Sequence, residues 1–341
     1  MNSTCDRATA LLNDTLVWDA HACLPLRFNQ DMGALERHRG AGVNYVSVNV
    51  GMDINPVSQV IRVIAGFRAW LTEHTDHFLF ARTVEDIRRA KVEGKLAVGF
   101  DLEGSVMLDD DVAMLALYRD LGVRQIHLAY NRDNSIAGGC HGADIGLTPL
   151  GRQVVAEINR LGLIMDCSHS GYRTSMEIME RSTRPVVYSH SNVRALRDHP
   201  RNLRDEQIDA CARTDGVIGL SGIGNFIGEG DVTTESLVRH LDYVVQRVGP
   251  RHVGLGLDYV FGAGGPGLEY VFEQSTEEYP SDFNREDWWP AAYYGDGFHM
   301  VPPERFPEIV EALLVRGYSD GDVGRILGGN FLRVAQVTWP A

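Results

Sequence analysis

The sequence predicts an α/β protein built as a distorted (β/α)₈ barrel, and three observations carry this prediction. Short runs rich in Val, Ile and Leu recur along the 341 residues, bounded by Gly and polar residues. Such runs are typical of strands buried on both faces of a parallel sheet. Helical patterns lie between them, and eight such strands over about 250 residues match the count of a barrel. No Gly-rich phosphate-binding fingerprint follows the first run, which disfavours the alternative, an open doubly wound sheet.

The expected strands follow one another along the first three quarters of the chain. They are residues 15–19, 43–50, 95–102, 123–130, 162–167, 185–189, 216–221 and 251–257. The helices that we expect most clearly are residues 57–73, 83–94, 148–162, 233–248 and 303–316. Two of them have explicit start signals. Thr83 precedes acidic residues in a first turn, and Thr148 precedes a proline, which suits an N-cap followed by Pro at the first helical position.

We expect a single domain over residues 1–341, with one break in the barrel rhythm after the eighth strand. Residues 261–302 lack clear periodicity and are acidic and aromatic. A long loop at this place in a barrel is often a lid or a contact surface. The alternative is a packed decoration that takes no part in the chemistry.

Composition and charge exclude several classes of partner. The chain has 32 Lys and Arg against 46 Asp and Glu, a net charge of −14, which argues against nucleic acid and against an anionic membrane surface. No apolar run reaches the roughly 18 residues of a membrane span, and the N-terminal residues do not resemble a signal peptide. The five cysteines form no disulfide framework, so a cytoplasmic location is expected.

Histidines and acidic residues follow the expected strands at their carboxyl ends, where a barrel holds its active site. They are His21 with Cys23, Glu103, His169, His190 and Asp258. Imidazoles with a carboxylate favour zinc, cobalt, iron or manganese over calcium or magnesium. Side chains two apart on a strand share a face, so His21 and Cys23 should point into the same lumen. Glu103 could bridge two metals, and Asp258 is well placed to move a proton from water to a leaving amine.

These residues lie within a longer set of motifs that resembles the renal (membrane) dipeptidase family, peptidase family M19 of the amidohydrolase superfamily. The motifs are WDAHACLP, GFDLEGS, LAYNRDNSIAGGC, GLTPLGRQVVAEINRLGLIMDCSHSG, RPVVYSHSNVRALRDHPRN, HVGLGLDY and ILGGNFLRV, in matching order from about residue 17 to 334. The resemblance implies a distorted TIM barrel with a binuclear zinc centre that hydrolyses dipeptides. It also implies acceptance of a D-residue or dehydro-residue on the C-terminal side, and makes a homodimer plausible.

The resemblance further implies a role for each site residue. His21 is then a ligand of one zinc, Glu103 bridges both, and the two later histidines, His169 and His190, bind the second zinc. Asp258 is the proton carrier. Arg201, which precedes Asn202, binds the substrate's α-carboxylate, since a guanidinium can hold a carboxylate through two parallel hydrogen bonds.

Cys23 departs from the family pattern, in which a zinc-binding Asp occupies this position. A thiolate is a good zinc ligand, and we favour ligation by Cys23. Three alternatives stay open. The first is a single firmly bound metal at Glu103, His169 and His190, with the other site weak or empty. The second is a changed substrate, with Cys23 near the reacting group. The third is a small packed residue in an eroded site.

Two further residues are candidates for substrate contacts. Tyr130 stands where many relatives have a His that steadies the scissile carbonyl, and its hydroxyl can donate a similar hydrogen bond; packing beneath the site is the alternative. His141 is expected to face the pocket from a loop. The other histidines are interpreted as ordinary strand, helix or loop residues, namely His38, His74, His77, His127, His199, His240, His252 and His299.

The function predicted from the sequence is that of a zinc-dependent metallo-dipeptidase acting on small molecules with a free carboxylate. One alternative keeps the metal hydrolase and changes the substrate to an N-acyl amino acid, a lactone or a pathway metabolite, and Cys23 motivates it. Another is an inactive relative that only binds a ligand. Retention of Glu103, His169, His190, Arg201 and Asp258 argues against it.

Overall fold

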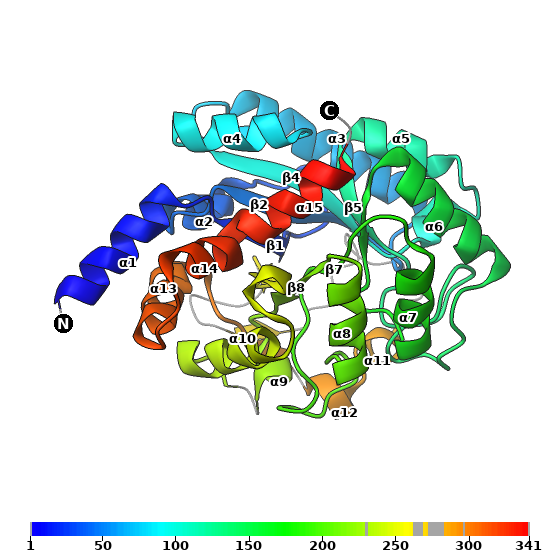
Figure 1. The fold of residues 1–341 in the computed structure, drawn as a ribbon. Coiled ribbons are helices and arrows are strands. Elements are labelled where there is room, and N and C mark those ends of the chain that lie inside the picture. The colour runs from blue at the N-terminus through cyan, green and yellow to red at the C-terminus, as the bar shows by residue number, and fades with distance from the viewer. Residues whose placement is uncertain (1, 229–230, 262–268, 272–282, 296, 340–341) are drawn as a thin grey trace.

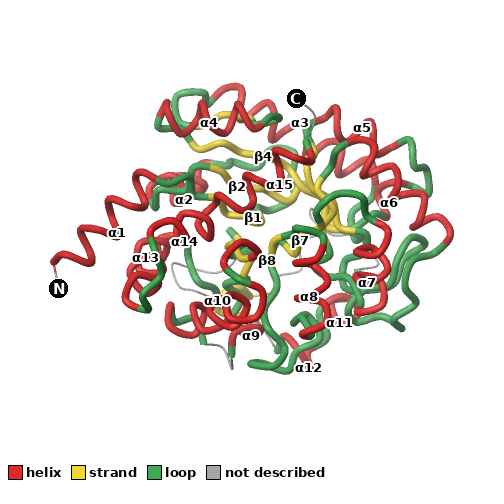
Figure 2. Tube along the Cα trace, viewed as in Figure 1, coloured by secondary structure: helices red, strands yellow, loops and turns green. Residues whose placement is uncertain are grey.

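The computed structural model describes residues 2–228, 231–261, 269–271, 283–295 and 297–339. A curled parallel sheet lies at its centre and helices surround the sheet (Figures 1 and 2). Neighbouring strands follow in the order β1 (Trp18–Cys23), β2 (Tyr45–Met52), β4 (Leu96–Glu103), β5 (Val123–His127), β6 (Ile164–Asp166), β7 (Val186–Tyr188), β8 (Val217–Leu220) and β9 (Val253–Leu255).

The sheet closes on itself through one segment that pairs on both sides. Its first part, β9, pairs with β8, and its second part, β10 (Tyr259–Val260), pairs in parallel with β1. Between the two parts, the Asp258 amide donates to the carbonyl oxygen of His21 over 3.0 Å. The predicted barrel is therefore confirmed, with an eighth strand that is interrupted at Asp258.

Two strands differ from the expectation. β1 extends to Cys23 instead of ending at residue 19, and its pairing with β2 shifts register between Asp19 and Ala22. Polar residues that face a barrel lumen look like loop residues in a sequence, which explains the early end. The three-residue strand β3 (Phe78–Phe80), which pairs only with β4, was not predicted.

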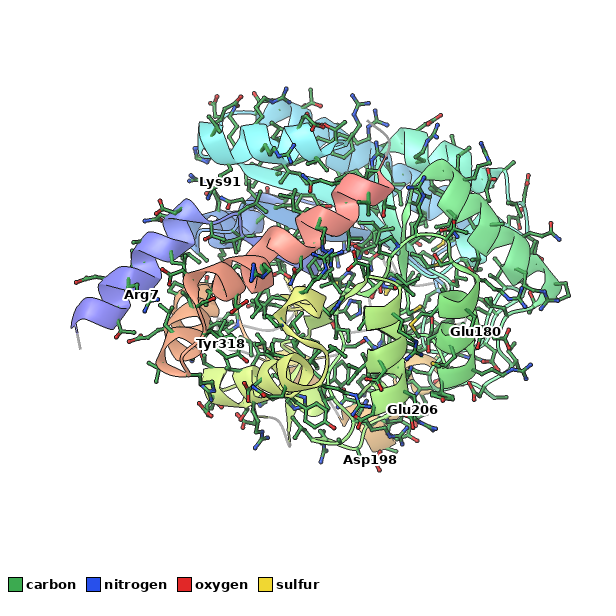
Figure 3. All side chains as sticks on the ribbon, in the orientation of Figure 1. Arg7, Lys91, Glu180, Asp198, Glu206 and Tyr318 are labelled. Carbon is green, nitrogen blue, oxygen red and sulfur yellow. The ribbon has the colours of Figure 1, made fainter. Side chains whose placement is uncertain are left out.

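Helices connect the strands and cover the outer surface of the sheet. They are α1 (Asn2–Asp14), α2 (Glu36–Gly40), α3 (Val57–Glu73), α4 (Val84–Glu93), α5 (Met114–Leu121), α6 (Pro149–Leu161), α7 (Tyr172–Arg181), α8 (Asp205–Arg213), α9 (Gly224–Ile227), α10 (Thr234–Val248), α13 (Phe306–Val315), α14 (Asp320–Gly324) and α15 (Asn330–Thr338), with a π-helical turn at Arg325–Gly329 and 3₁₀ turns at Gly33–Leu35, Val106–Leu108, Pro250–His252 and Pro303–Arg305. Charged side chains such as Arg7, Glu180 and Glu206 point outward from these helices (Figure 3). None of the helices in the described ranges is both long and apolar enough to cross a membrane.

The predicted helix starts have the expected capping bonds. The Thr83 hydroxyl accepts a hydrogen bond from the amide of Asp86 over 3.1 Å, and the Thr148 hydroxyl accepts one from the amide of Gly151 over 3.0 Å. A side-chain acceptor of this kind satisfies an amide that has no partner within the helix.

The amino-terminal end of the barrel is closed by an aromatic cluster. The rings of Trp18 and Tyr45 lie 3.9 Å apart, and Phe331 and Trp339 of the C-terminal segment lie 6.0 and 5.9 Å from Trp18. Tight packing of these rings stabilises the fold at this end, whereas the loops at the opposite end of a barrel carry the active site. Access to the barrel interior is thus from the carboxyl ends of the strands.

The segment 261–302, which was expected to be a long loop without clear periodicity, contains short elements of regular structure in its described part. β11 (Glu269–Val271) pairs antiparallel with β12 (Gly297–His299), and two short helices, α11 (Arg285–Trp288) and α12 (Ala291–Tyr294), lie between them. Four-residue helices are too short to produce a detectable period. Residues 262–268, 272–282 and 296 of the predicted insertion lie outside the described part of the chain.

Candidate metal centre

The side chains predicted to bind metal converge at the carboxyl end of the barrel. Oε1 of Glu103 lies 3.2 Å from Nε2 of His21, 3.0 Å from Nε2 of His169 and 3.5 Å from Nε2 of His190. Sγ of Cys23 lies 3.4 Å from Nε2 of His21. The donor atoms of five residues, which come from parts of the chain far apart in sequence, therefore lie close together at this end of the barrel.

The donor atoms form overlapping groups of three. In the described residues, the groups whose atoms lie within 4.8 Å of one another are His21–Cys23–Glu103, Glu103–His169–His190 and His21–His190–Asp258. The first two groups share only Glu103, whose two oxygens give it the capacity to bridge. This arrangement fits two metal ions held side by side.

The ring of His21 is oriented by a carboxylate behind it. Nδ1 of His21 lies 3.2 Å from Oδ1 of Asp101, and Oδ2 of Asp101 accepts a hydrogen bond from the Ser47 hydroxyl over 2.6 Å. A carboxylate in this position keeps the proton on Nδ1 and leaves the Nε2 lone pair for a metal. Asp101 was quoted in the motif GFDLEGS without a role. Its signal was its spacing, because it lies two residues before Glu103 on the same strand face.

The other ligands are held by side chains that the sequence analysis did not single out. Nδ1 of His169 donates to Oδ1 of Asn131 over 2.7 Å, and Nδ1 of His190 lies 2.7 Å from the Ser189 hydroxyl. Nδ2 of Asn49 donates to Oε2 of Glu103 over 2.6 Å. All three histidine Nε2 atoms and one Glu103 oxygen are therefore turned inward.

The protonation states of the second donor group suit metal binding. At His21, burial works to lower the pKa, but Asp101 and Glu103 outweigh it and hold that pKa well above its ordinary value, so a metal would displace a proton from this ring. Burial, strengthened by neighbouring positive groups, holds the pKa of His169 and of His190 well below its usual value, so both rings are neutral. Burial works to raise the pKa of Glu103, but His21 and His169 outweigh it and hold that pKa well below its ordinary value. Two neutral imidazoles and a carboxylate form a typical donor set for a divalent transition metal.

Asp258 lies at the edge of the cluster with its carboxyl group partly accessible. Its Oδ1 is 3.8 Å from Nε2 of His21, and its side chain is 14% exposed. Burial and the charge of Glu103, partly offset by His21 and Arg201, raise the pKa of Asp258 to about 7. A carboxyl group with such a pKa can both accept and release a proton near neutral pH.

Three residues around the cluster have a left-handed backbone. The φ angles of Asn131, His169 and Asp258 are 61°, 66° and 58°. Asn, Asp and His tolerate this region better than other non-glycine residues, but it remains uncommon for them. These three residues follow or interrupt strands beside the cluster, and strained backbone is common at functional sites.

Arg201 lies beside the second donor group and is only 3% exposed. One of its terminal nitrogens, Nη2, lies 3.1 Å from Nε2 of His169 and donates to the carbonyl oxygen of His190 over 3.3 Å. Its guanidinium carbon lies 5.2 Å from the centroid of the Phe226 ring. Packing and hydrogen bonding thus fix a positive charge next to the cluster.

Tyr130 connects the cluster to the insertion. Its ring centroid lies 4.4 Å from that of His169, and its hydroxyl accepts a hydrogen bond from Nε1 of Trp289 over 2.9 Å. Burial and the nearby charge of Glu103 raise the pKa of Tyr130 well above its usual value, so the hydroxyl keeps its proton.

His141 and His199 both face the insertion. The His141 ring stacks on Tyr293 with centroids 5.0 Å apart, and its Nε2 lies 3.0 Å from the Tyr294 hydroxyl. Burial, aided by Arg201, lowers the pKa of His141 to about 3. His199 was interpreted as an ordinary residue, but it is buried and its Nδ1 accepts from the amide of Arg201 over 3.1 Å.

Comparison with known proteins agrees with this geometry. Residues 5–275 match the family model described as membrane dipeptidase (Peptidase family M19). Dipeptidase tcpJ of Claviceps purpurea is 30% identical over 266 residues, which are 76% of this chain and 55% of that protein. The chain spans about half the length of the curated relatives that it matches.

Solved structures share the whole fold. A structure described as an amidohydrolase from Pseudomonas aeruginosa superposes with a TM-score of 0.84 at 26% identity, covering 97% of this chain and 99% of that one. A metallopeptidase from Rhodobacter sphaeroides, solved with a phosphinate mimic of the dipeptide L-Ala-D-Ala, has a TM-score of 0.76 at 21% identity, covering 96% and 100%. Together, the matched sequence and the shared barrel show that this chain belongs to the membrane dipeptidase family, peptidase family M19.

Proposed function

We propose that this protein is a zinc-dependent dipeptidase that cleaves the peptide bond of dipeptides with a free C-terminal carboxylate. The observation that carries the proposal is the pair of donor groups sharing Glu103, with the buried Arg201 beside them. The names of the curated relatives support a dipeptidase. The dipeptide mimic bound by the Rhodobacter structure supports a substrate whose C-terminal residue has the D-configuration.

The donor set indicates which residues would hold the metal. His21, Cys23 and Glu103 would hold one zinc ion, and Glu103, His169 and His190 would hold the other. Bound zinc supplies Lewis acidity and lowers the pKa of water. A single zinc in the second group remains the alternative if Cys23 does not ligate.

Asp258 is the proposed proton carrier. Its carboxylate can take a proton from the attacking water and pass it to the amine that leaves, because its pKa of about 7 lies close to neutral pH. Its Oδ1 lies 3.8 Å from Nε2 of His21 at the edge of the cluster, which supports this role.

Arg201 and Tyr130 are proposed to position the substrate. The Arg201 guanidinium would hold the α-carboxylate through two parallel hydrogen bonds. The Tyr130 hydroxyl already accepts from Trp289, so its own proton is free to be donated to the scissile carbonyl oxygen. His141 is neutral and can line the same space from its loop.

A second candidate function keeps the metal centre and changes the substrate to an N-acyl amino acid, a lactone or a pathway metabolite. The observation that favours it is Cys23, whose Sγ lies within the cluster, 3.4 Å from Nε2 of His21 and 4.0 Å from Nδ2 of Asn49. A thiolate is softer than a carboxylate and offers one donor atom instead of two, so the first site would have a different charge distribution.

Cellular context and assembly are also proposals. The five cysteines are unpaired, which supports a reducing compartment such as the cytoplasm. A single domain and a homodimer follow from the family resemblance.

Metal analysis combined with a substrate panel tests the proposed function. The purified protein should contain zinc at close to two equivalents and hydrolyse dipeptides faster than matched N-acyl amino acids, lactones and dipeptide amides. Faster turnover of an N-acyl amino acid or a lactone would instead favour the second candidate. Tight binding of a dipeptide by the metal-loaded protein without any turnover would indicate a ligand-binding relative.

A further inference from the structure

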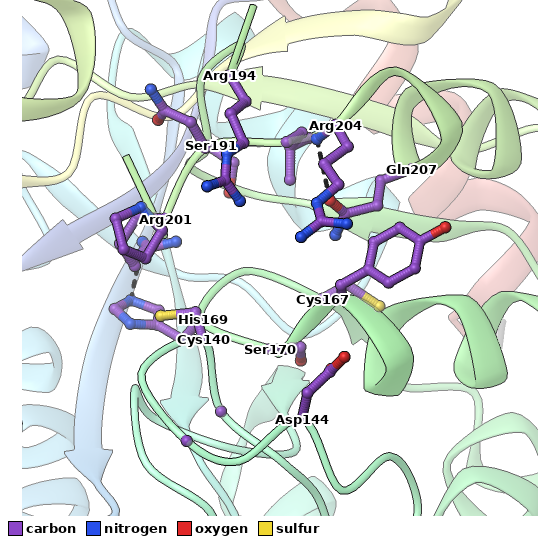
Figure 4. A pocket seen from close by; sticks show the side chains of 17 residues that line it. Cys140, Asp144, Cys167, His169, Ser170, Ser191, Arg194, Arg201, Arg204 and Gln207 are labelled. Carbon is purple, nitrogen blue, oxygen red and sulfur yellow. Dashed lines mark hydrogen bonds between the residues drawn. The ribbon is translucent and has the colours of Figure 1, made fainter. Parts of the chain in front are cut away.

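A cavity borders Arg201 and His169 (Figure 4). It has a volume of about 150 Å³ and is enclosed by the loops that follow β5, β6 and β7. Cys140 and Asp144 come from the first loop, Ser170 from the second, and Ser191 and Arg194 from the third. The described metal cluster does not use this space, which is large enough for a small ion with its hydration water.

The side chains around this cavity are predominantly positive. Arg194, Arg201 and Arg204 line it, against the single carboxylate of Asp144. This excess is notable in a chain whose net charge is −14. Asp144 is partly engaged, since its Oδ1 accepts from the amide of Arg173 over 2.7 Å.

Two of the three arginines have unused donors. Arg194 donates from Nε to Asp198 over 2.8 Å, which leaves its terminal nitrogens for another acceptor. The guanidinium carbon of Arg204 lies 4.6 Å from the centroid of the Tyr172 ring, and none of the carboxylates in the described residues forms an ion pair with it. Figure 4 shows both side chains extending toward the open centre of the cavity.

Buried polar atoms in the cavity wall also lack partners. The hydroxyls of Ser170 and Ser191, in residues 7% and 1% exposed, have no hydrogen-bond partner within the described part of the chain. Nε of Arg201, which is 3% exposed, has none there either. Buried polar groups in native proteins are nearly always satisfied, so a ligand or ion that accepts from these groups is expected.

The start of helix α7 adds a further preference for negative charge. Ser170 and Gly171 directly precede this ten-residue helix and line the cavity. The amino end of a helix carries a partial positive charge that favours anions.

We propose that this cavity is an anion-binding subsite for a small oxyanion of the phosphate or carboxylate class, held by Arg194, Arg204, Ser170 and Ser191. The oxyanion is either free in solution or an acidic group of the substrate's C-terminal residue. Because Arg201 contacts both this cavity and the metal cluster, an anion here also fixes the arginine that is proposed to bind the substrate.

The first arm of the test measures binding of inorganic phosphate to the purified full-length protein by calorimetry, with the metal content as isolated. It compares the wild type with the double variant Arg194→Gln/Arg204→Gln, in which Arg201 is retained. Wild type should show one saturable site that the double variant loses or binds at least about tenfold more weakly, as expected for losing charged hydrogen bonds. Arg173→Gln is the matched control, because Arg173 lies on α7, whose amino end lines the cavity, and its side chain pairs with Glu177 outside the cavity. This arm is independent of the proposed dipeptidase activity.

The second arm, which rests on the proposed function, identifies the source of the oxyanion. The KM values for Ala-D-Glu and Ala-D-Gln are compared in the wild type and the double variant. A KM that rises at least about fivefold for the acidic dipeptide alone assigns the subsite to the substrate, whether or not phosphate binds. Phosphate binding that is lost in the double variant, with both KM values unchanged, assigns it to a free anion. The subsite would be overturned if the KM values for both dipeptides changed equally and phosphate either did not bind or bound equally to both proteins.

Discussion

Cys23 is the residue at which this chain departs most from the pattern that it resembles. Burial raises the pKa of the Cys23 thiol to about 12, partly offset by His21, so without metal it is protonated. A zinc ion would have to displace this proton, and binding at the first site should strengthen as the pH rises. The thiol is close enough to His21 and Glu103 to join them as a ligand.

Replacing Cys23 by Ala should lower the zinc content from two equivalents toward one. The second group, Glu103 with His169 and His190, contains no cysteine and should keep its ion. Elemental analysis of the purified variants measures this directly. Cys5→Ala, which removes an exposed thiol far from the cluster in sequence, is the control and should keep the wild-type content. An unchanged zinc content in Cys23→Ala would exclude Cys23 as a required ligand.

Asp258→Asn should lower kcat by several orders of magnitude while leaving the zinc content intact, because the amide cannot accept a proton. In the wild type, the carboxylate form is the proton acceptor, so kcat/KM should rise with pH as Asp258 deprotonates. The pKa of Asp258 is about 7 without metal, and nearby cations would lower it. The rise of kcat/KM with pH should therefore occur at a more acidic pH in the metal-loaded enzyme. Steady-state kinetics between pH 4 and 9 measure both effects. Turnover by the variant at the wild-type rate would exclude the proton-carrier role.

Arg201→Met should weaken binding of substrates with a free carboxylate far more than binding of their amides. The guanidinium is buried at 3% exposure and can form a charge-assisted pair only with the carboxylate form. KM values for a dipeptide and its C-terminal amide, measured in both proteins, give the comparison. An equal loss for both substrates would mean that Arg201 acts on the cluster itself, where its Nη2 lies 3.1 Å from Nε2 of His169.

At the scale of elements, the described part of the insertion after the eighth strand contacts residues around the site. Nδ2 of Asn131 donates to the carbonyl oxygen of Trp288 over 2.9 Å, and Nε1 of Trp289 donates to Tyr130. Tyr293 and Tyr294 of α12 pack on His141. The short helices α11 and α12 are therefore held by contacts with the residues around the metal cluster, more than by their own helical propensity.

Trp289→Phe tests whether this contact positions Tyr130. The variant keeps an aromatic ring but loses the donor to the Tyr130 hydroxyl, so kcat/KM should fall by about fivefold, the value of one ordinary hydrogen bond. Zinc content should not change. Trp288→Phe is the matched control, because the Trp288 contact with Asn131 comes from its backbone carbonyl, which the substitution retains. Equal kinetic effects in the two variants would argue against a specific role for the indole donor.

At the scale of the molecule, the proposed metals would join distant parts of the ring. The proposed ligands lie at the ends of β1 and β4 and shortly after β6 and β7, and the eighth strand is interrupted beside them at Asp258. Ions that bind only the folded chain stabilise it by mass action, and they would also relieve the crowding of three imidazoles around Glu103.

Removal of metal with a chelator should therefore lower the melting temperature by several degrees. A ligand at 100 times its dissociation constant adds about 2.7 kcal/mol to the free energy of unfolding. Adding zinc back after chelation should restore the melting temperature. Scanning calorimetry of the wild type before and after chelation gives the shift. The Cys23→Ala variant should show a smaller one. A metal-loaded wild type whose melting temperature is insensitive to chelation would contradict tight binding at this cluster.

The sequence alone was sufficient for the barrel and for the side chains that converge at its carboxyl end. Continuous apolar runs and their helical spacers indicated the repeated unit, and His21, Cys23, Glu103, His169 and His190 were identifiable by their place at strand ends. These features are local in the chain, because strand period and strand end are properties of neighbouring residues.

The residues that orient those ligands were decided by the tertiary structure. Asn49, Asn131 and Ser189 are ordinary polar residues in the sequence, and only the closed ring brings each to a ligand atom. The same holds for Trp289 on Tyr130, and for the positive cavity formed by three separate loops. Contacts between segments that are far apart in sequence leave no periodic or compositional signal. The sequence therefore determined which donor side chains are available, and the tertiary structure decided how they are held and what surrounds them.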